Sequence, residues 1–283
     1  MDKFPRTLAG DVSLPRMIIG TNWFLGWSHQ SVAKDNFIKT FQTREKVAEI
    51  LSVFLEAGVD AIMSPISPML RDAICDAEDR AGRKIVWILT PSFNLLPGGP
   101  PEQDPERVLD ACRELGGTFC LPHQCVTDAL IDRRARVIRD LDRYTKMIRD
   151  RGMIPGLSTH MPEAVPYADA MNADVATYIQ IYNAAGFLMQ IEVDWVMRLI
   201  AEAKKPVMTI KPFAAGRLSV PVGLAFVWST IREQDMVTVG TTTPDEAKEV
   251  IAISLDLLSR RMPSNVLQKT RSKQSLEPAR ARA

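Results

Sequence analysis

Three histidines are the side chains whose type and placement point most directly to chemistry. His29, His123 and His160 are the only histidines among 283 residues, and each lies just beyond a short apolar run. An imidazole titrates near neutral pH, so it can accept or deliver a proton during a reaction. We predict that His123 and His160 are catalytic and that His29 binds substrate. The alternative for His123 is a buried ring that is hydrogen-bonded to a backbone carbonyl.

Lys211 ends the apolar run 207–211 and is the candidate nucleophile. A lysine that is partly buried at a strand end loses hydration, which lowers its pKa and leaves a neutral amine able to attack a carbonyl. The alternatives are that Lys211 binds a carboxylate or phosphate, or that it extends into solvent. If Met208 and Ile210 face the surrounding helices, strand alternation turns Thr209 and Lys211 inward.

The run 176–182 adds polar side chains at the same edge. Its two isoleucines are expected to face the helices, which would turn the residues between them inward. On this basis we predict that Tyr182 is catalytic and that Tyr178, Gln180 and the following Asn183 bind substrate.

The segment 22–42 is a long connection between one apolar run and the next helical pattern. Its aromatic residues predict a lid over the site, while the alternative is an ordinary insertion packed on neighbouring loops. Asn22, Trp23 and His29 are predicted to bind substrate from this segment. Lys34 and Asp35 lie farther along it and are also able to reach inward.

A metal site is not predicted. Three histidines can ligate one ion, but no carboxylate lies at a suitable strand end to complete the set. The four cysteines, in a long chain without a secretion signal, are expected to be reduced thiols.

The elements that must position these residues follow a regular alternation. Short apolar runs alternate with amphipathic stretches that have three-and-four spacing, which predicts parallel strands joined by helices. The last helix begins at the capping box Thr243-Pro244-Asp245-Glu246. No glycine-rich phosphate loop follows the first run, which disfavours an open doubly wound sheet. The fold class is therefore α/β, a (β/α)8 TIM barrel, with strands expected at 17–20, 59–64, 85–90, 118–123, 154–158, 176–182, 207–211 and 236–240.

Composition sets the domain boundaries and the partners. Residues 1–258 form one predicted barrel domain with a net charge of about −5, and 259–283 form a basic tail that is expected to be disordered. Such a charge gives no nucleic-acid surface, and no apolar run is long enough to cross a membrane. The chain also lacks a signal-peptide core, so a cytoplasmic location is expected. The polar residues gathered at the barrel mouth predict a small-molecule substrate. The pattern does not determine whether the chain forms a homo-oligomer.

Several motifs in order resemble the aldo-keto reductases across residues 4–258. They are Gly20-Thr21-Asn22-Trp23, Leu121-Pro122-His123, Gly156-Leu157-Ser158, Gln180-Ile181-Tyr182-Asn183, Pro212-Phe213-Ala214-Ala215-Gly216 and Gly240-Thr241-Thr242-Thr243-Pro244. The resemblance implies a barrel whose lower end is closed by an N-terminal β-hairpin cap.

The departures from that family bear on function. Its members pair hydride transfer from a nicotinamide cofactor with a tyrosine, lysine, aspartate and histidine, and only the histidine has a match here, His123. Met63 stands at the aspartate position. Ser158 and Gln180 match positions that hold the nicotinamide, while Ile210 replaces the aromatic residue that stacks on it. The cofactor is left open, with NADP as the candidate.

Three hypotheses follow. The first is a non-redox enzyme of the lyase, aldolase, dehydratase or isomerase type, which acts on a small polar carbonyl or sugar-like compound through His123, Lys211 and Tyr182. The second is an NAD(P)H-dependent oxidoreductase with a substitute proton donor. The third is a barrel that binds a ligand or partner without turnover.

Overall fold

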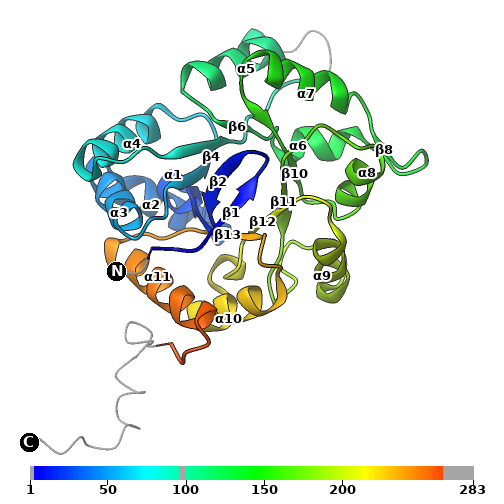
Figure 1. The fold of residues 1–283 in the computed structure, drawn as a ribbon. Coiled ribbons are helices and arrows are strands. Elements are labelled where there is room, and N and C mark those ends of the chain that lie inside the picture. The colour runs from blue at the N-terminus through cyan, green and yellow to red at the C-terminus, as the bar shows by residue number, and fades with distance from the viewer. Residues whose placement is uncertain (1–2, 96–99, 264–283) are drawn as a thin grey trace, which may run out of the picture.

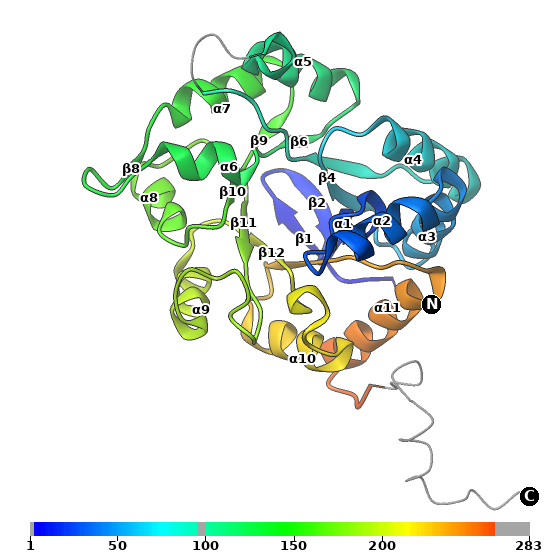
Figure 2. The ribbon, with the colours of Figure 1, turned by 180° about the vertical axis from the view of Figure 1, so that it is seen from behind.

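The computed structural model describes residues 3–95 and 100–263 as a ring of parallel strands surrounded by helices (Figure 1). The same ring is seen from the other end in Figure 2, where α1 (Asn22–Leu25) and α2 (Val32–Phe41) lie in front of the barrel. Most of the predicted basic tail, residues 264–283, lies outside the described residues.

Every predicted apolar run holds a strand, so the alternation is confirmed. The main sheet has the order β10-β11-β12-β13-β3-β4-β5-β6-β9, with parallel pairing throughout. Its strands are β3 (Met17–Gly20), β4 (Ala61–Ser64), β5 (Val86–Leu89), β6 (Phe119–Cys120), β9 (Ile154–Pro155), β10 (Leu157–Thr159), β11 (Tyr178–Ile181), β12 (Val207–Ile210) and β13 (Met236–Val239).

The barrel closes at Gly156, which separates β9 from β10 in one continuous run. The N–H of Gly156 donates to the carbonyl of Cys120 on one side, at 3.2 Å, and the N–H of Leu157 donates to Thr177 on the other, at 3.0 Å. A Cβ at position 156 would lie 2.5 Å from Cγ of Leu121. Only glycine fits this position, because the seam brings the backbone against an inward-facing leucine.

Helices follow the strands and cover the outside of the barrel (Figure 1). The predicted cap of α11 is present in a shifted form: the hydroxyl of the N-cap Thr243 accepts from the N–H of Glu246, and the Glu246 carboxylate accepts from the N–H of Thr242, one residue before the N-cap. The remaining helices are α3 (Arg44–Glu56), α4 (Pro68–Ala81), α5 (Pro105–Glu114), α6 (Gln124–Thr127), α7 (Leu141–Asp150), α8 (Ala164–Ala170), α9 (Val193–Glu202), α10 (Val220–Thr230) and α11 (Pro244–Leu258). A second short hairpin, β7 (Ile131–Asp132) with β8 (Val137–Ile138), projects between α6 and α7.

An N-terminal hairpin caps the lower end, as predicted. Strands β1 (Arg6–Ala9) and β2 (Val12–Pro15) pair antiparallel and lie across the barrel opening in Figure 1. Ala9 and Leu14 are fully buried in one cluster with residues inside the barrel, including Ile18 and Ile88. The hairpin therefore seals this end, and ligands must enter from the other.

Strand alternation differs from the prediction. Met208, Ile210 and Ile179 pack in the interior cluster, whereas Tyr178 and Val207 pack with the helices. The prediction had assumed that apolar residues face outward. It was wrong because the interior of a small barrel is itself a packed apolar core.

The same alternation corrects four placements that the sequence had turned inward. Tyr178, Gln180 and Tyr182 share the outer face of β11, and Thr209 shares the outer face of β12, where its hydroxyl donates to the carbonyl of Met236 at 3.0 Å.

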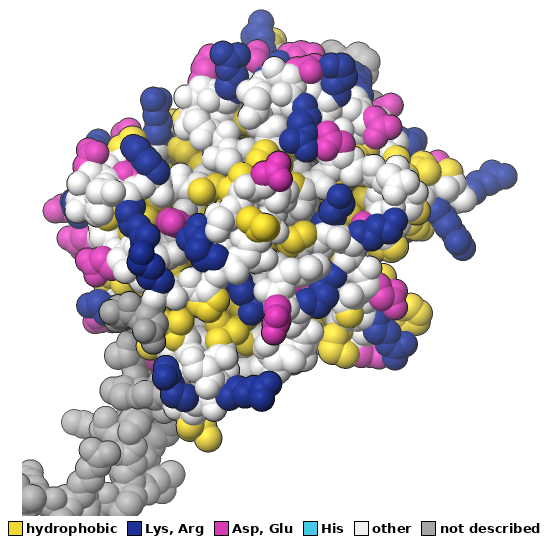
Figure 3. Space-filling view, in the orientation of Figure 1, with side chains coloured by type: hydrophobic (Ala, Val, Ile, Leu, Met, Phe, Trp, Pro, Cys, Tyr) yellow, Lys and Arg dark blue, Asp and Glu magenta, His cyan; other side chains and the backbone are white. Residues whose placement is uncertain are grey.

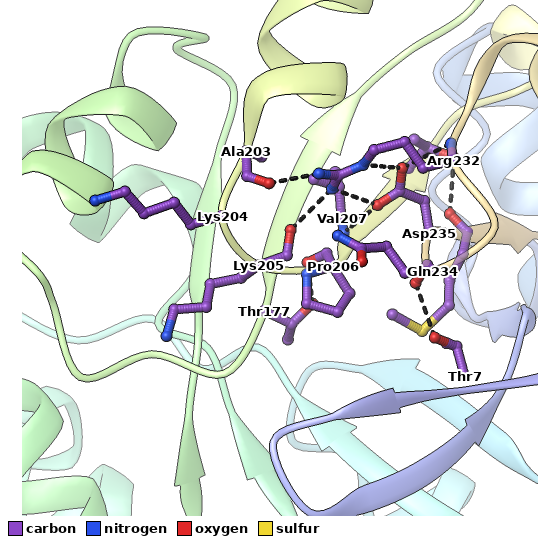
Figure 4. Close-up of polar contacts among 12 residues, drawn as sticks. Thr7, Thr177, Ala203, Lys204, Lys205, Pro206, Val207, Arg232, Gln234 and Asp235 are labelled. Atoms are coloured by element: carbon purple, nitrogen blue, oxygen red, sulfur yellow. Dashed lines mark hydrogen bonds and ion pairs between the residues drawn. The ribbon is translucent and has the colours of Figure 1, made fainter.

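A buried ion pair fastens the lower ends of β12 and β13 (Figure 4). Asp235 is fully buried, and its carboxylate accepts from the Arg232 guanidinium at 2.7 Å and from the N–H of Val207 at 2.9 Å. The same guanidinium donates to the carbonyl oxygens of Ala203 and Lys205. The carboxylate therefore holds the start of β12, and its guanidinium partner holds the loop that follows α9.

The outer surface has mixed charge. On the face that carries the hairpin, Lys and Arg side chains are interspersed with Asp and Glu (Figure 3). Within the described part of the chain, no helix is both long enough and apolar enough to cross a membrane.

Candidate active site at the barrel mouth

A cavity of about 360 Å³ opens at the C-terminal ends of β3, β12 and β13, opposite the hairpin. This is the end at which barrel enzymes place their reacting groups. Asn22, Trp23, His29 and Lys211 all line it, so the structure brings four predicted site residues together. Trp23 packs directly over Gly240, where a Cβ would lie 2.8 Å from Cδ1 of the indole ring.

Lys211 and His29 are in direct contact at the wall of this cavity. Nζ of Lys211 lies 3.0 Å from Nε2 of His29. Both residues have left-handed backbone, with φ of 63° at Lys211 and 57° at His29. This conformation is costly for residues with a Cβ and is concentrated at functional sites. Thr209, two residues earlier, faces outward, so regular strand alternation would turn Lys211 outward as well. The left-handed backbone at Lys211 interrupts this alternation and allows its side chain to reach the mouth.

The contacts of His29 define which of its nitrogens is free. Nδ1 lies 3.0 Å from the carbonyl oxygen of Trp27. A carbonyl only accepts, so Nδ1 carries the hydrogen, and Nε2 presents its lone pair to Lys211. Next to it, the side-chain amide of Gln30 donates to the carbonyl of Ala215 at 2.8 Å. Residues 27–30 therefore form a strap from the first loop to the β12–α10 loop.

His123 presents the opposite nitrogen. It is the N-cap of α6, and its Nδ1 lies 3.4 Å from the N–H of Cys125 and 3.1 Å from the Cys125 thiol. Both groups donate, so Nδ1 is the acceptor and the hydrogen is on Nε2. His29 thus offers a lone pair, whereas His123 offers an N–H.

His160 follows β10 on the inward-facing side. Its backbone N–H donates to the carboxylate of Asp128 at 3.2 Å, and that carboxylate also accepts from the hydroxyl of Thr159 at 2.5 Å. Asp128 therefore holds the backbone on which His160 stands. Burial raises the pKa of Asp128, while these hydrogen bonds act in the opposite direction.

The four nitrogen-bearing side chains influence one another. Burial lowers the pKa of Lys211 to about 8. Burial, and then the charge of Lys211, lowers the pKa of His29 and of His123. The pKa of His160 falls to about 4 through burial, then Lys211, His123 and His29. Lys211 and His29 line the cavity, whereas His123 and His160 are not among its lining residues, and all three imidazoles have a pKa below the ordinary value of histidine.

Four residues that were predicted to act or bind at the mouth do not line the cavity: Tyr178, Gln180, Tyr182 and Asn183. The fully buried Tyr182 donates its hydroxyl to Thr230 in α10, at 3.0 Å, and Tyr178 donates to Asp169 in α8, at 2.6 Å. Asn183 is buried and binds both the N–H and the carbonyl of Phe187. Their placement at the mouth was wrong, because the two tyrosine hydroxyls bond to residues of the surrounding helices and the Asn183 amide bonds to the backbone of its own loop.

The residues present do not fit a nicotinamide dinucleotide. Ser158 and Gln180 do not line the cavity, and alternation places Gln180 on the outer face of its strand. Ile210 packs in the interior cluster and offers no aromatic ring. Glu246 and Glu249 line the cavity at α11, and the Glu246 carboxylate occupies the N–H of Thr242, which is then not available to a phosphate group.

A metal centre is not formed by the described residues. Within 3–95 and 100–263, no group of three or more His, Cys, Asp or Glu side chains could hold an ion. Cys112 and Cys120 are buried, whereas Cys75 and Cys125 are exposed, and all four thiols are free.

Sequence reasoning missed the strap and the acidic wall of the cavity. Gln30 follows directly after His29 but has no pattern that predicts its contact with Ala215. Glu246 was assigned only its capping role. The capping box also placed Glu249 one turn farther along the same helix face, and this three-residue spacing was the signal that could have revealed both glutamates at the mouth.

Comparison with known proteins gives likeness at the level of structure only. No family model matches the chain, and no curated protein matches its sequence. A protein from Pseudomonas aeruginosa assigned to the aldo-keto reductases superposes with a TM-score of 0.64 at 15% identity, covering 91% of this chain and 98% of its own. An aldo-keto reductase from Bacillus halodurans in its holo form gives 0.58 at 13% identity, covering 97% and 95%. One from Brucella melitensis gives 0.58 at 12%, covering 93% and 95%.

These likenesses agree with the closed parallel barrel, its ring of helices and its N-terminal hairpin. At such identities they establish the fold and leave the chemistry to the residues of this chain. The chain therefore has the (β/α)8 barrel fold of the aldo-keto reductases, with a hairpin cap at its lower end.

Proposed function

We propose that the protein is a non-redox enzyme that forms a Schiff base between Lys211 and a small carbonyl compound, in the manner of a lyase, aldolase, dehydratase or isomerase. The observation that carries this proposal is the pair of Lys211 Nζ and His29 Nε2, 3.0 Å apart at the wall of the cavity. An amine with a pKa of about 8 is partly neutral at physiological pH, and only the neutral form attacks a carbonyl.

The two histidine tautomers assign the proton steps. His29 Nε2 takes a proton from the Lys211 ammonium, and the free amine adds to the carbonyl carbon to give a carbinolamine. The N–H of His123 donates a hydrogen bond to the carbonyl oxygen and stabilises the negative charge that develops there. One proton from the carbinolamine nitrogen and the proton held by His29 then pass to this oxygen, the C–O bond breaks, and water leaves as the protonated imine forms, which returns His29 to its neutral form. The imine then withdraws electrons from the adjacent carbon, as bond cleavage, dehydration and isomerisation all require. His160 is proposed as the second imidazole of the site.

Reductive trapping tests this proposal. The full chain is incubated with small aldehydes and ketones and cyanoborohydride, and the modified residue is located by peptide mass spectrometry. We expect an adduct on Lys211, its loss in Lys211→Met and in Lys211→Arg, and its retention in Lys248→Met, an exposed lysine on α11. Equal labelling of Lys211 and exposed lysines would overturn the proposal.

The oxidoreductase hypothesis has a separate readout. Trp23 and Trp27 line the cavity, so a bound dinucleotide would quench their fluorescence. We expect NADPH and NADH to leave the emission unchanged. Saturable quenching that disappears in Trp23→Phe would favour the reductase instead.

A further inference from the structure

The strap, residues 27–30, holds His29 in an unfavourable backbone conformation. His29 has a φ of 57°, in the left-handed region that a residue with a Cβ keeps only when its surroundings impose it. The strap lies outside the helices and strands, so regular structure does not supply this constraint. The contacts of the imidazole with the Trp27 carbonyl and with Lys211 orient the ring rather than the backbone. The constraint therefore comes from the residues on either side of His29.

Asp35 anchors both neighbours of His29 through one oxygen atom. Its Oδ1 accepts from the backbone N–H of Ser28 at 2.7 Å and from the Ser28 hydroxyl at 2.6 Å. The same hydroxyl accepts from the backbone N–H of Gln30 at 3.1 Å. Ser28 is 1% exposed, and its two bonds to a carboxylate are of the strong, charge-assisted kind. A single carboxylate thereby fixes the backbone before and after His29.

The helix α2 sets the place of this carboxylate. Asp35 lies in the first turn of α2, where its backbone N–H donates to the carbonyl of Ser31 at 3.0 Å. The hydroxyl of Ser31 caps the helix by accepting from the N–H of Lys34 at 3.2 Å. Gly26 packs against the same turn, since a Cβ there would lie 2.8 Å from the Asp35 carbonyl oxygen. The helix and the start of the strap are therefore held together next to the anchor.

We infer that Asp35 is a positioning residue of the proposed reaction, which acts through Ser28 to hold Nε2 of His29 against the Lys211 amine. This inference rests on the proposed function, in which His29 takes the proton of Lys211. Asp35 is not among the residues that line the cavity, so it acts through the strap rather than on the substrate. Without the carboxylate, the left-handed turn at His29 relaxes and the imidazole leaves the amine.

Three variants separate the anchor from other effects of substitution. Asp35→Ala removes the anchor, whereas Asp35→Asn keeps an oxygen that accepts the same two bonds. Asn36→Ala is the matched control, because it changes the exposed neighbour on the same helix. Nitrogen NMR of the His29 ring gives the position of its hydrogen. We expect the hydrogen on Nδ1 in the wild-type protein, in Asp35→Asn and in Asn36→Ala, and a mixture of both tautomers in Asp35→Ala.

The pH dependence of Lys211 acetylation by acetic anhydride is the second readout, and it needs no Schiff base. An amine that is released from His29 is better hydrated and keeps its proton to higher pH. In Asp35→Ala we expect the midpoint to rise by about one pH unit, so that labelling at pH 7 falls about tenfold. Loss of a negative charge alone acts in the opposite direction, which Asp35→Asn measures.

The outcomes distinguish this inference from the proposed function. If the His29 tautomer and the Lys211 midpoint are the same in Asp35→Ala as in Asn36→Ala, the inference is overturned, even if carbonyl compounds are trapped on Lys211. If both readouts change as expected but the wild-type protein traps no carbonyl compound, Asp35 positions the pair and the proposed function fails.

A further variant keeps the test decisive if Asp35→Ala does not fold. Ser28→Ala removes the hydroxyl that joins Asp35 to Gln30 and leaves the bond from the Ser28 N–H in place. We expect the same two changes in a smaller size. A wild-type tautomer together with a wild-type midpoint in folded Ser28→Ala would overturn the inference.

Discussion

At the scale of single residues, the amine of Lys211 lies where its charge is disfavoured. Its pKa is about 8 in the folded state against 10.5 in the unfolded chain. Between these values the unfolded state binds more protons, so stability rises with pH from 8 to 10.5, and below pH 8 the full penalty is present. The reactivity that we propose for this amine would therefore come at the expense of stability, as is common at active sites.

Replacing the amine should therefore stabilise the protein. We expect Lys211→Met to raise the free energy of unfolding by about 1 to 2 kcal/mol at pH 7, because methionine fills the site without a charge to desolvate. Urea denaturation at several pH values measures this effect. The gain should shrink as pH approaches 10.5, and Lys248→Met should show none. A gain that is independent of pH would contradict the assigned cause.

The same amine sets a pH profile for labelling. Because only the neutral form reacts, trapping on Lys211 should rise about tenfold per pH unit below 8 and level off above it. Exposed lysines should continue to gain reactivity up to about pH 10.4. Quantitative mass spectrometry of both classes in one sample checks this. A common midpoint for Lys211 and the exposed lysines would refute a lowered pKa.

At the scale of elements, hydrophobic periodicity predicted where the strands and helices lie, and it did so because every run alternates with a stripe of helical spacing. It could not predict which strand face points inward. In β12 both faces are apolar enough to be buried, so Met208 and Thr209 give no decisive signal. The same limit applies to the candidate site. The sequence placed the histidines after predicted strands, but the turn that brings Lys211 inward depends on a left-handed backbone that no local pattern encodes.

The seam of the barrel offers a test at this scale. Gly156→Ala should destabilise the protein by about 1 to 3 kcal/mol, because the added Cβ would overlap the Leu121 side chain. Glycine at this position has no positive φ, so the effect is steric. The double variant Gly156→Ala/Leu121→Ala should be less destabilised than the sum of the two single variants in thermal unfolding. Strict additivity would indicate that the two sites do not interact.

At the scale of the whole molecule, the two ends of the barrel differ in how they are packed and in what charges they hold. The lower end is closed by the hairpin and fastened by Asp235, whereas the mouth holds strained backbone and unpaired charge. The stabilising contacts and the proposed site therefore lie at opposite ends of the strands, as is usual in this architecture.

The fastening at Asp235 should be measurable. Asp235→Asn removes the fully buried carboxylate and leaves the Arg232 guanidinium, whose side chain is 23% exposed, without its anion; we expect a loss of about 3 kcal/mol, the low end for a buried pair. Asp174→Asn is the matched control, because it breaks an exposed pair with Arg149 that contributes about 0 to 1 kcal/mol. Chemical denaturation compares them. Similar losses in both variants would mean that burial does not distinguish the two pairs.

The pairing of β3 with β13 has a consequence for biosynthesis. The ribosome delivers β3 and the residues of the strap first, but their neighbours in the cavity wall are among the last parts of the barrel to emerge. A nascent chain therefore carries an open sheet edge and no binding pocket until nearly the whole barrel has been synthesised. Truncation before residue 236 would release a protein that has His123 and Lys211 but lacks the strand that completes the enclosure around them.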